Sequence, residues 1–289
     1  MIKKGIILAG GTGSRLNPLT KILNKQLLPL YDKPLIFYSL SVLMLAGIKN
    51  ILIIVNPNQK ASFQKILGDG SFCGIKISYK EQKKPRGLPD AFILGEQFVK
   101  NDNVAMILGD NFFYGQGFTK RLSQIIKKNK GATIFAYNVK NPEKYGIVKF
   151  NQKNKILNIE EKPKKPKTNF AITGLYFFDK RVVNMSKNIK PSSRGELEIV
   201  DILKKYLLIN KLNLEFIGRG GAWLDAGSPK DLFDASQFVA TIEKRQGLKI
   251  ACIEEIAFNK GWIDKKLLKE RIRFYGKCSY SDYLRNILQ

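Results

Sequence analysis

The residues best suited to chemistry in this 289-residue chain surround a glycine-rich turn near its start. The apolar run Ile6-Ile7-Leu8 predicts a buried strand that leads directly into Gly10-Gly11-Thr12-Gly13. Glycines let backbone N–H groups approach a phosphate and adopt the positive φ that such a turn needs. Arg15 and Lys25 follow closely, and their charges are suited to neutralising a triphosphate. The pattern predicts a nucleoside triphosphate site.

Two better-known glycine motifs do not fit this turn. No Gly-Lys-Ser/Thr follows it, as a P-loop requires, and Leu16 stands where the last glycine of a dinucleotide-binding G-x-G-x-x-G belongs. A tight surface turn without a ligand is the simpler alternative.

Two carboxylates form a second feature. Asp110 follows the apolar run Val104–Leu108, and Asp225 follows Trp223 after a glycine-rich approach. Either aspartate alone is as often a helix cap or a turn residue. Together they can converge on one hard cation, with phosphate oxygens and waters completing its shell, so the pair predicts a Mg²⁺ site.

Composition narrows the chemistry further. The chain has no histidine, which excludes Ser–His–Asp and Cys–His catalysis and most zinc sites and favours phosphoryl or nucleotidyl transfer. Three widely spaced cysteines predict reduced thiols and a cytoplasmic protein, and no apolar run is long enough to span a membrane. The net charge of +26 comes from lysines dispersed along the chain, so we expect no nucleic-acid partner.

The elements that must position these residues alternate between strands and helices over about the first 140 residues. Strands are expected at 51–55, 75–79 and 104–108, between helices at 34–46, 59–67 and 88–99. Such alternation predicts a doubly wound, mostly parallel sheet, with ligands beyond the carboxyl ends of its strands. Short strands at 133–139, 147–150, 156–160 and 170–178 predict a mixed or antiparallel extension. Helices at 197–208 and 231–243, a strand at 214–217 and a helical tail complete the prediction.

The motifs resemble those of the sugar-1-phosphate nucleotidylyltransferases, in order and in spacing, from residue 2 to about residue 260. The resemblance rests on Leu8-Ala-Gly-Gly-x-Gly-x-Arg15-Leu-x-Pro18-x-Thr20, Lys25-Gln-Leu-Leu-Pro29, Leu108-Gly-Asp-Asn111, Glu160-Glu-Lys-Pro163, Arg194-Gly-Glu-Leu-Glu198 and Trp223-Leu-Asp225. It implies a Rossmann-like fold with a catalytic domain over 1–250, divided into a nucleotide-binding part at about 1–110 and a sugar-binding part at about 111–228. Residues 251–289 would form a C-terminal helical lobe, not an independent domain.

Within that family the chain is most similar to members that join dTTP and α-D-glucose 1-phosphate into dTDP-glucose and pyrophosphate, a first step toward dTDP-rhamnose or another deoxysugar. A uridylyl- or cytidylyltransferase acting on a hexose 1-phosphate, or an inactive regulatory relative, is the alternative. The resemblance implies catalytic roles for Arg15, Lys25, Lys162, Asp110 and Asp225, the last two holding Mg²⁺. It implies nucleotide binding by Leu8, Gly10, Gly11, Gly13, Gln26, Gln82, Gly87 and Leu88, with Arg15, Lys25 and Asp110. It implies sugar binding by Asn111, Tyr145, Gly146, Glu161, Lys162, Ile172, Tyr176, Arg194 and Trp223.

The resemblance also implies a homotetramer with an effector site for dTDP-rhamnose. The matching residues are Tyr114, Gly115, Phe118, Arg219, Glu255, Ile256 and Asn259. Two positions depart from the family pattern, because Thr119 stands where histidine is common and Asn259 where a cation is expected. Asparagine cannot replace the charge of a cation facing a diphosphate, so weak feedback inhibition is expected.

Overall fold

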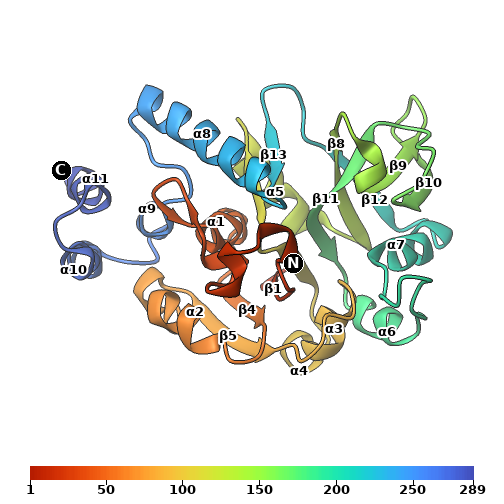
Figure 1. Cartoon of the computed structure of the whole chain (residues 1–289), viewed down its shortest axis with the longest axis horizontal. Helices are drawn as coiled ribbons and strands as arrows, with labels where there is room; N and C mark the ends of the chain where they lie inside the picture. Colours follow the sequence, from red (N-terminus) through yellow and green to blue (C-terminus); the bar gives the residue numbers. More distant parts are fainter.

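The computed structural model describes all 289 residues and confirms the α/β prediction. A nine-stranded mixed sheet has the order β10-β9-β11-β6-β1-β4-β5, with β8 paired to β11 and β12 paired to β8 (Figure 1). Its strands are β1 (Lys4–Ala9), β4 (Asn50–Val55), β5 (Lys76–Glu81), β6 (Val104–Leu108), β8 (Ala132–Asn138), β9 (Gly146–Phe150), β10 (Ile156–Glu161), β11 (Phe170–Phe178) and β12 (Leu212–Phe216).

The helices cover both faces of this sheet. They are α1 (Ile36–Leu45), α2 (Lys60–Leu67), α3 (Asp90–Leu94), α4 (Glu96–Val99), α5 (Phe118–Lys128), α6 (Val182–Lys187), α7 (Ile199–Leu208), α8 (Pro229–Gln246), α9 (Ile253–Asn259), α10 (Lys265–Tyr275) and α11 (Ser279–Ile287). Side chains of α1, α2, α5 and α9 pack on one face, and those of α3, α4, α6 and α7 pack on the other. Successive residues of β1 therefore enter different cores, which explains its unbroken apolar sequence.

The parallel part of the sheet carries the carboxyl ends that matter for the site. Strands β6, β1, β4 and β5 are parallel neighbours, whereas β11 runs antiparallel to both β6 and β8. The glycine turn follows β1 and Asp110 follows β6. Because β1 and β6 are hydrogen-bonded parallel neighbours, the turn and Asp110 lie at the same edge of the sheet.

Helices α5 and α6 were not expected from the sequence, and two further features differ from the sequence-based expectation. The helix expected at 88–99 is two helices, α3 and α4, that meet at Gly95. A β-carbon built on Gly95 would lie 2.8 Å from the Ala91 carbonyl oxygen and 3.2 Å from side chains of Ile6 and Leu52, so the chain passes too close to the sheet for a larger residue.

The second difference is a two-stranded ribbon formed by β7 (Asn111–Tyr114) and β13 (Ala222–Asp225). The strands are antiparallel and place Asp225 opposite Asn111. Neither strand was expected, because each is four residues long and its partner lies about a hundred positions away in the sequence. This ribbon brings the two predicted metal ligands together.

The C-terminal helices α9, α10 and α11 lie at the end of the molecule opposite β9 and β10 (Figure 1). Helix α9 packs on α1, and its Glu254 is fully buried, where it accepts hydrogen bonds from the hydroxyls of Tyr275 and Tyr280 and pairs with Arg271. These helices share the apolar core on the α1 face of the sheet. The division into domains at residue 250 stays a prediction.

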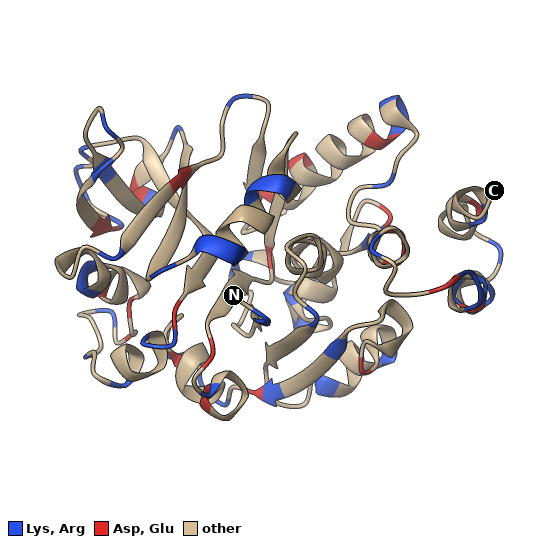
Figure 2. Cartoon of the chain, turned by 180° about the vertical axis from the view of Figure 1, so that it is seen from behind, with Lys and Arg blue, Asp and Glu red and all other residues tan.

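Lysine and arginine are spread over helices, strands and loops rather than gathered on one element (Figure 2). No helix has both the length and the apolar character needed to cross a membrane.

Candidate active site

The glycine turn is held in place by two side chains, one of which follows a neighbouring strand. Gly11 and Gly13 have φ values of 109° and 60°, which glycine adopts more readily than other residues. The Asn56 side chain, just after β4, accepts from the Gly11 N–H at 2.9 Å and donates to the Gly11 carbonyl at 2.7 Å. The Thr20 hydroxyl donates to the Gly13 carbonyl at 2.8 Å. Asn56 and Thr20 were absent from the predicted site, although Asn56 stands at a predicted strand end and Thr20 belongs to the opening motif.

Lys25 lies beside the turn and forms an ion pair with Asp110. It begins a short 3₁₀ turn, Lys25–Leu27, whose preceding residue Asn24 accepts from the Gln26 N–H at 2.8 Å. The Lys25 side chain is 9 % exposed and that of Asp110 19 %, so the pair is shielded but open toward the turn. A cavity of about 230 Å³, which we call the turn cavity, contains both residues with Gly10–Arg15, Gln26 and Gly227.

Asp225 reaches the same place from the ribbon. The backbone N–H of Ala226 donates to the Asp110 carbonyl at 3.2 Å, which ties the ends of the two carboxylate-bearing segments together. Burial, and next the negative charge of Asp110, raise the pKa of Asp225, while Lys25 and Arg15 lower it. A cation at this position would relieve the repulsion.

The two aspartates can hold a hard divalent cation whose coordination shell is completed by a bound ligand and water. Their oxygens are the donor type that Mg²⁺ prefers, and the charge repulsion between them favours a cation. No group of three or more acidic, cysteine or histidine side chains able to hold a metal occurs in the structure. A cation here would therefore draw its remaining ligands from phosphate oxygens and water.

Two glutamines lie on either side of the turn. Gln26 is 4 % exposed, and its Oε1 is buried without a hydrogen-bond donor. Gln82 follows β5, and a β-carbon built on Gly10 would lie 2.7 Å from its Oε1. An unpartnered buried acceptor is costly, so the Gln26 oxygen favours a bound donor from a ligand. Of the other residues predicted to bind nucleotide, Leu8 lies in β1, while Gly87 and Leu88 line the neighbouring larger cavity.

That larger cavity, of about 1,070 Å³, is called here the sugar cavity. All nine residues predicted to bind sugar line it: Asn111, Tyr145, Gly146, Glu161, Lys162, Ile172, Tyr176, Arg194 and Trp223. The structure thus brings together residues from β7, β9, β10, β11 and β13 and the intervening loops. Their individual roles stay predictions.

One side chain organises the apolar wall of the sugar cavity. Asn111 Oδ1 accepts from Trp223 Nε1 at 2.6 Å and from the Gly174 N–H at 3.0 Å. The Tyr145 ring meets Trp223 edge to face with 5.2 Å between ring centres. Asn111 is 1 % exposed, so its hydrogen bonds hold this wall of the cavity in place.

Another part of the sugar cavity wall is charged. Glu161 pairs with Arg194 at 3.1 Å, and Arg194 also pairs with Glu198 at 2.9 Å. Burial, and next the Glu198 charge, raise the pKa of Glu161. Lys162 has a φ of 40°, an unusual backbone conformation that follows directly after β10. Glu198 was absent from the predicted site, although it ends the motif that begins at Arg194.

The residues matched to the effector site fall into two groups. Tyr114, Gly115 and Phe118 lie beside the loop that holds Arg219, since a β-carbon on Gly115 would be 3.2 Å from Gly221. Glu255, Ile256 and Asn259 lie on α9, where Glu255 accepts a hydrogen bond from the Tyr283 hydroxyl at 2.8 Å. No hydrogen bond or ion pair joins the two groups.

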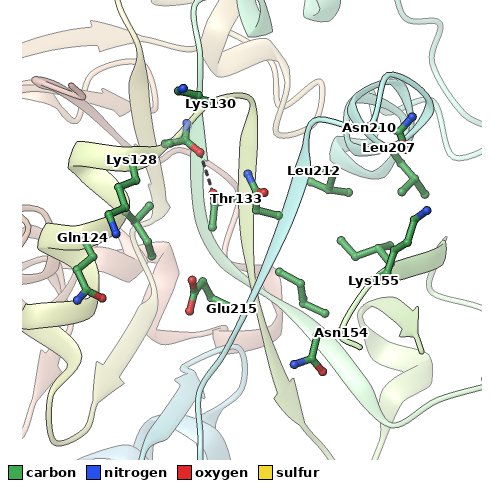
Figure 3. A pocket seen from close by; sticks show the side chains of 15 residues that line it. Gln124, Lys128, Lys130, Thr133, Asn154, Lys155, Leu207, Asn210, Leu212 and Glu215 are labelled. Atoms are coloured by element: carbon green, nitrogen blue, oxygen red, sulfur yellow. Dashed lines mark hydrogen bonds between the residues drawn. The ribbon is translucent and has the colours of Figure 1, made fainter. Parts of the chain in front are cut away.

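A further cavity of about 800 Å³ lies between the end of α5, β12 and the turn before β10. Lys128, Lys130 and Lys155 and the carboxylate of Glu215 are among its lining side chains (Figure 3). None of the predicted catalytic, nucleotide or sugar residues lines it, so it is separate from the candidate active site.

Comparison with known proteins decides the family. The model of the nucleotidyl transferase family matches residues 4–242. The chain is 54 % identical to the glucose-1-phosphate thymidylyltransferase of Neisseria meningitidis over 99 % of both chains.

The chain belongs to the nucleotidyl transferases of the glucose-1-phosphate thymidylyltransferase group.

Other relatives of this enzyme family agree. The glucose-1-phosphate thymidylyltransferase of Mycobacterium tuberculosis is 46 % identical over 99 % of both chains. A solved glucose-1-phosphate thymidylyltransferase structure from Bacillus anthracis has 40 % identity and a TM-score of 0.75, over 81 % of this chain and 94 % of that one. A UDP-glucose pyrophosphorylase structure with UDP-glucose has 27 % identity and a TM-score of 0.73, over 85 % of this chain and 100 % of that one. The predicted resemblance and the nucleotidyltransferase class are confirmed.

Proposed function

We propose that this nucleotidyltransferase moves a thymidylyl group from dTTP to α-D-glucose 1-phosphate, giving dTDP-glucose and pyrophosphate. The observation that carries the proposal is the position of Arg15. It lines the turn cavity together with Lys25 and Asp110, and it lines the sugar cavity together with Lys162 and Asp225. Two adjoining cavities that share a cation suit two polyanionic substrates that must meet.

The reaction needs positioning and charge neutralisation more than covalent chemistry. The phosphate oxygen of the sugar phosphate is already an anion at neutral pH and attacks the α-phosphorus in line, while pyrophosphate leaves on the opposite side. Lys162 would hold the attacking phosphate. Arg15 and Lys25 would neutralise charge on the leaving pyrophosphate.

Asp110 and Asp225 would hold Mg²⁺, which supplies Lewis-acid stabilisation of phosphate charge when it is bound. Asp110 also orients Lys25, because the only ion pair of Lys25 is with Asp110. We place this enzyme in the cytoplasm, where nucleoside triphosphates are available and where the free thiols Cys73, Cys252 and Cys278 stay reduced.

Pyrophosphate release tests the function directly. With glucose 1-phosphate present, we expect turnover with dTTP or UTP and a kcat/KM with ATP or GTP that is lower by about tenfold or more, because the family resemblance implies a base pocket at Gln26, Gln82 and Gly87 that is too shallow for a fused ring. CTP separates the uridylyl- and cytidylyltransferase alternatives. A comparable kcat/KM with ATP contradicts the base-site assignment, and no turnover with any nucleotide supports the inactive relative.

We further propose a homotetramer in which dTDP-rhamnose inhibits weakly at the effector residues. Asn259 offers no charge for a diphosphate, and the neighbouring Lys260 ammonium already lies 5.6 Å from the centre of the Trp262 ring. Asn259→Arg is therefore expected to tighten inhibition about fivefold or more, since coupling between sites is usually worth about 1–3 kcal/mol.

The measurement is the dTDP-rhamnose concentration for half inhibition, with light scattering for the oligomeric state. Asn158→Arg, the same substitution at an exposed position of β10, is the matched control and should not change inhibition. Equal inhibition of the wild type and Asn259→Arg would mean that another cation serves the site.

A further inference from the structure

A buried carboxylate fixes the orientation of one glutamine beside the glycine turn. Asp90, the first residue of α3, is 1 % exposed and accepts a hydrogen bond from Nε2 of Gln82 at 2.8 Å. Its other oxygen accepts from Nε and Nη2 of Arg86 at 3.1 and 2.5 Å. An ionised carboxylate only accepts hydrogen bonds, so the NH₂ half of the Gln82 amide must face Asp90.

The carbonyl half of that amide must then face the turn. Oε1 of Gln82 lies against Gly10, as the 2.7 Å separation from a β-carbon built there shows. The backbone N–H of Gln82 donates to the Val55 carbonyl at 2.8 Å, which anchors the residue at the end of β5. Gln82 is also 4 % exposed, so it has little room to turn over. The site therefore presents an acceptor rather than a donor.

We infer that Asp90 is a positioning residue that sets the choice of pyrimidine through Gln82, an inference that rests on the proposed function. Thymine and uracil carry a hydrogen on N3 and can donate it to Oε1. Cytosine carries a lone pair on N3, which would face the lone pairs of Oε1. A glutamine free to flip would accept either base, whereas one held by a carboxylate rejects cytosine.

The test is the substitution Asp90→Asn. Asparagine keeps the shape of the side chain but can both donate and accept, so the Gln82 amide gains a second orientation. We expect kcat/KM for dTTP relative to dCTP to fall by about 10- to 100-fold. The ratio for dTTP relative to dUTP should stay constant, because both bases carry the N3 hydrogen.

A matched control and a double substitution separate positioning from a general structural effect. Asp102→Asn removes the same charge from an ion pair with Lys4 at the surface and should leave both ratios unchanged. In a Gln82→Ala background, Asp90→Asn should no longer change the dTTP-to-dCTP ratio. Asp90→Ala, a smaller residue that removes the carboxylate and leaves both orientations of the Gln82 amide open, takes the place of Asp90→Asn if that variant does not fold.

The outcomes distinguish this inference from the proposed function. An unchanged dTTP-to-dCTP ratio in a folded variant, including an equal loss of kcat/KM for both nucleotides, overturns the role of Asp90. A change in the ratio that persists in the Gln82→Ala background also overturns it. In each of these cases an active wild type leaves the proposed function standing. A wild type that turns over no pyrimidine nucleotide overturns both.

Discussion

Replacing Lys25 by alanine is expected to lower kcat by about 10²- to 10³-fold, with a smaller change in dTTP binding. The Lys25 ammonium lies in the turn cavity beside Asp110, where charge on the departing pyrophosphate would develop. A contact that strengthens as the bond breaks stabilises the transition state more than the bound substrate. Loss of one such contact typically costs roughly 10²–10³ in rate.

Steady-state kinetics and equilibrium dTTP binding separate the two effects of Lys25→Ala. Lys21→Ala is the matched control, since Lys21 is an exposed lysine on the same loop and outside both cavities. Its kcat should equal that of the wild type. An unchanged kcat in Lys25→Ala would remove Lys25 from the catalytic residues.

Asp110→Asn and Asp225→Asn are expected to abolish divalent-ion-dependent activity, with a loss of at least about 10²-fold. Each amide keeps the side-chain shape but removes the charge that a hard cation requires. The measurement is activity over a Mg²⁺ titration, together with Mn²⁺ binding in the presence of dTTP. Asp282→Asn, in an exposed ion pair with Arg285 on α11 and outside both cavities, is the control that should behave as the wild type.

The stability of Asp225→Asn distinguishes lost chemistry from lost folding. In the metal-free protein, the raised pKa of Asp225 means that its charge disfavours the folded state. This penalty is full above the raised pKa, shrinks as the pH falls from there toward the ordinary aspartate pKa, and is absent below it. A neutral asparagine lacks this penalty, so at pH 8 the variant should melt no lower than the wild type.

If the Mg²⁺ titration curves of Asp110→Asn and Asp225→Asn both match that of the wild type, the metal site lies elsewhere.

The sequence alone was enough for the local features of the active site. The glycine turn, Arg15 and Lys25 lie within about twenty residues of one another, so their proximity follows from chain connectivity. Strands β1, β4 and β6 can also be recognised in the sequence by their apolar runs, because strands buried on both faces must be apolar throughout. The family resemblance added the members of the sugar cavity, which no spacing argument supplies.

Tertiary structure decided how distant segments meet. Asp110 and Asp225 converge because β7 and β13 pair, and strands of four residues carry too little periodicity to be recognised in sequence. Asn56, Glu198 and Asp90 act on the site through hydrogen bonds to the glycine turn, Arg194 and Gln82. The sequence places Asn56 at a strand end and Glu198 in the motif of Arg194, but it does not show which hydrogen bonds these residues form. Side-chain polarity shows that a residue needs a hydrogen-bond partner, but only the packed chain determines which partner it receives.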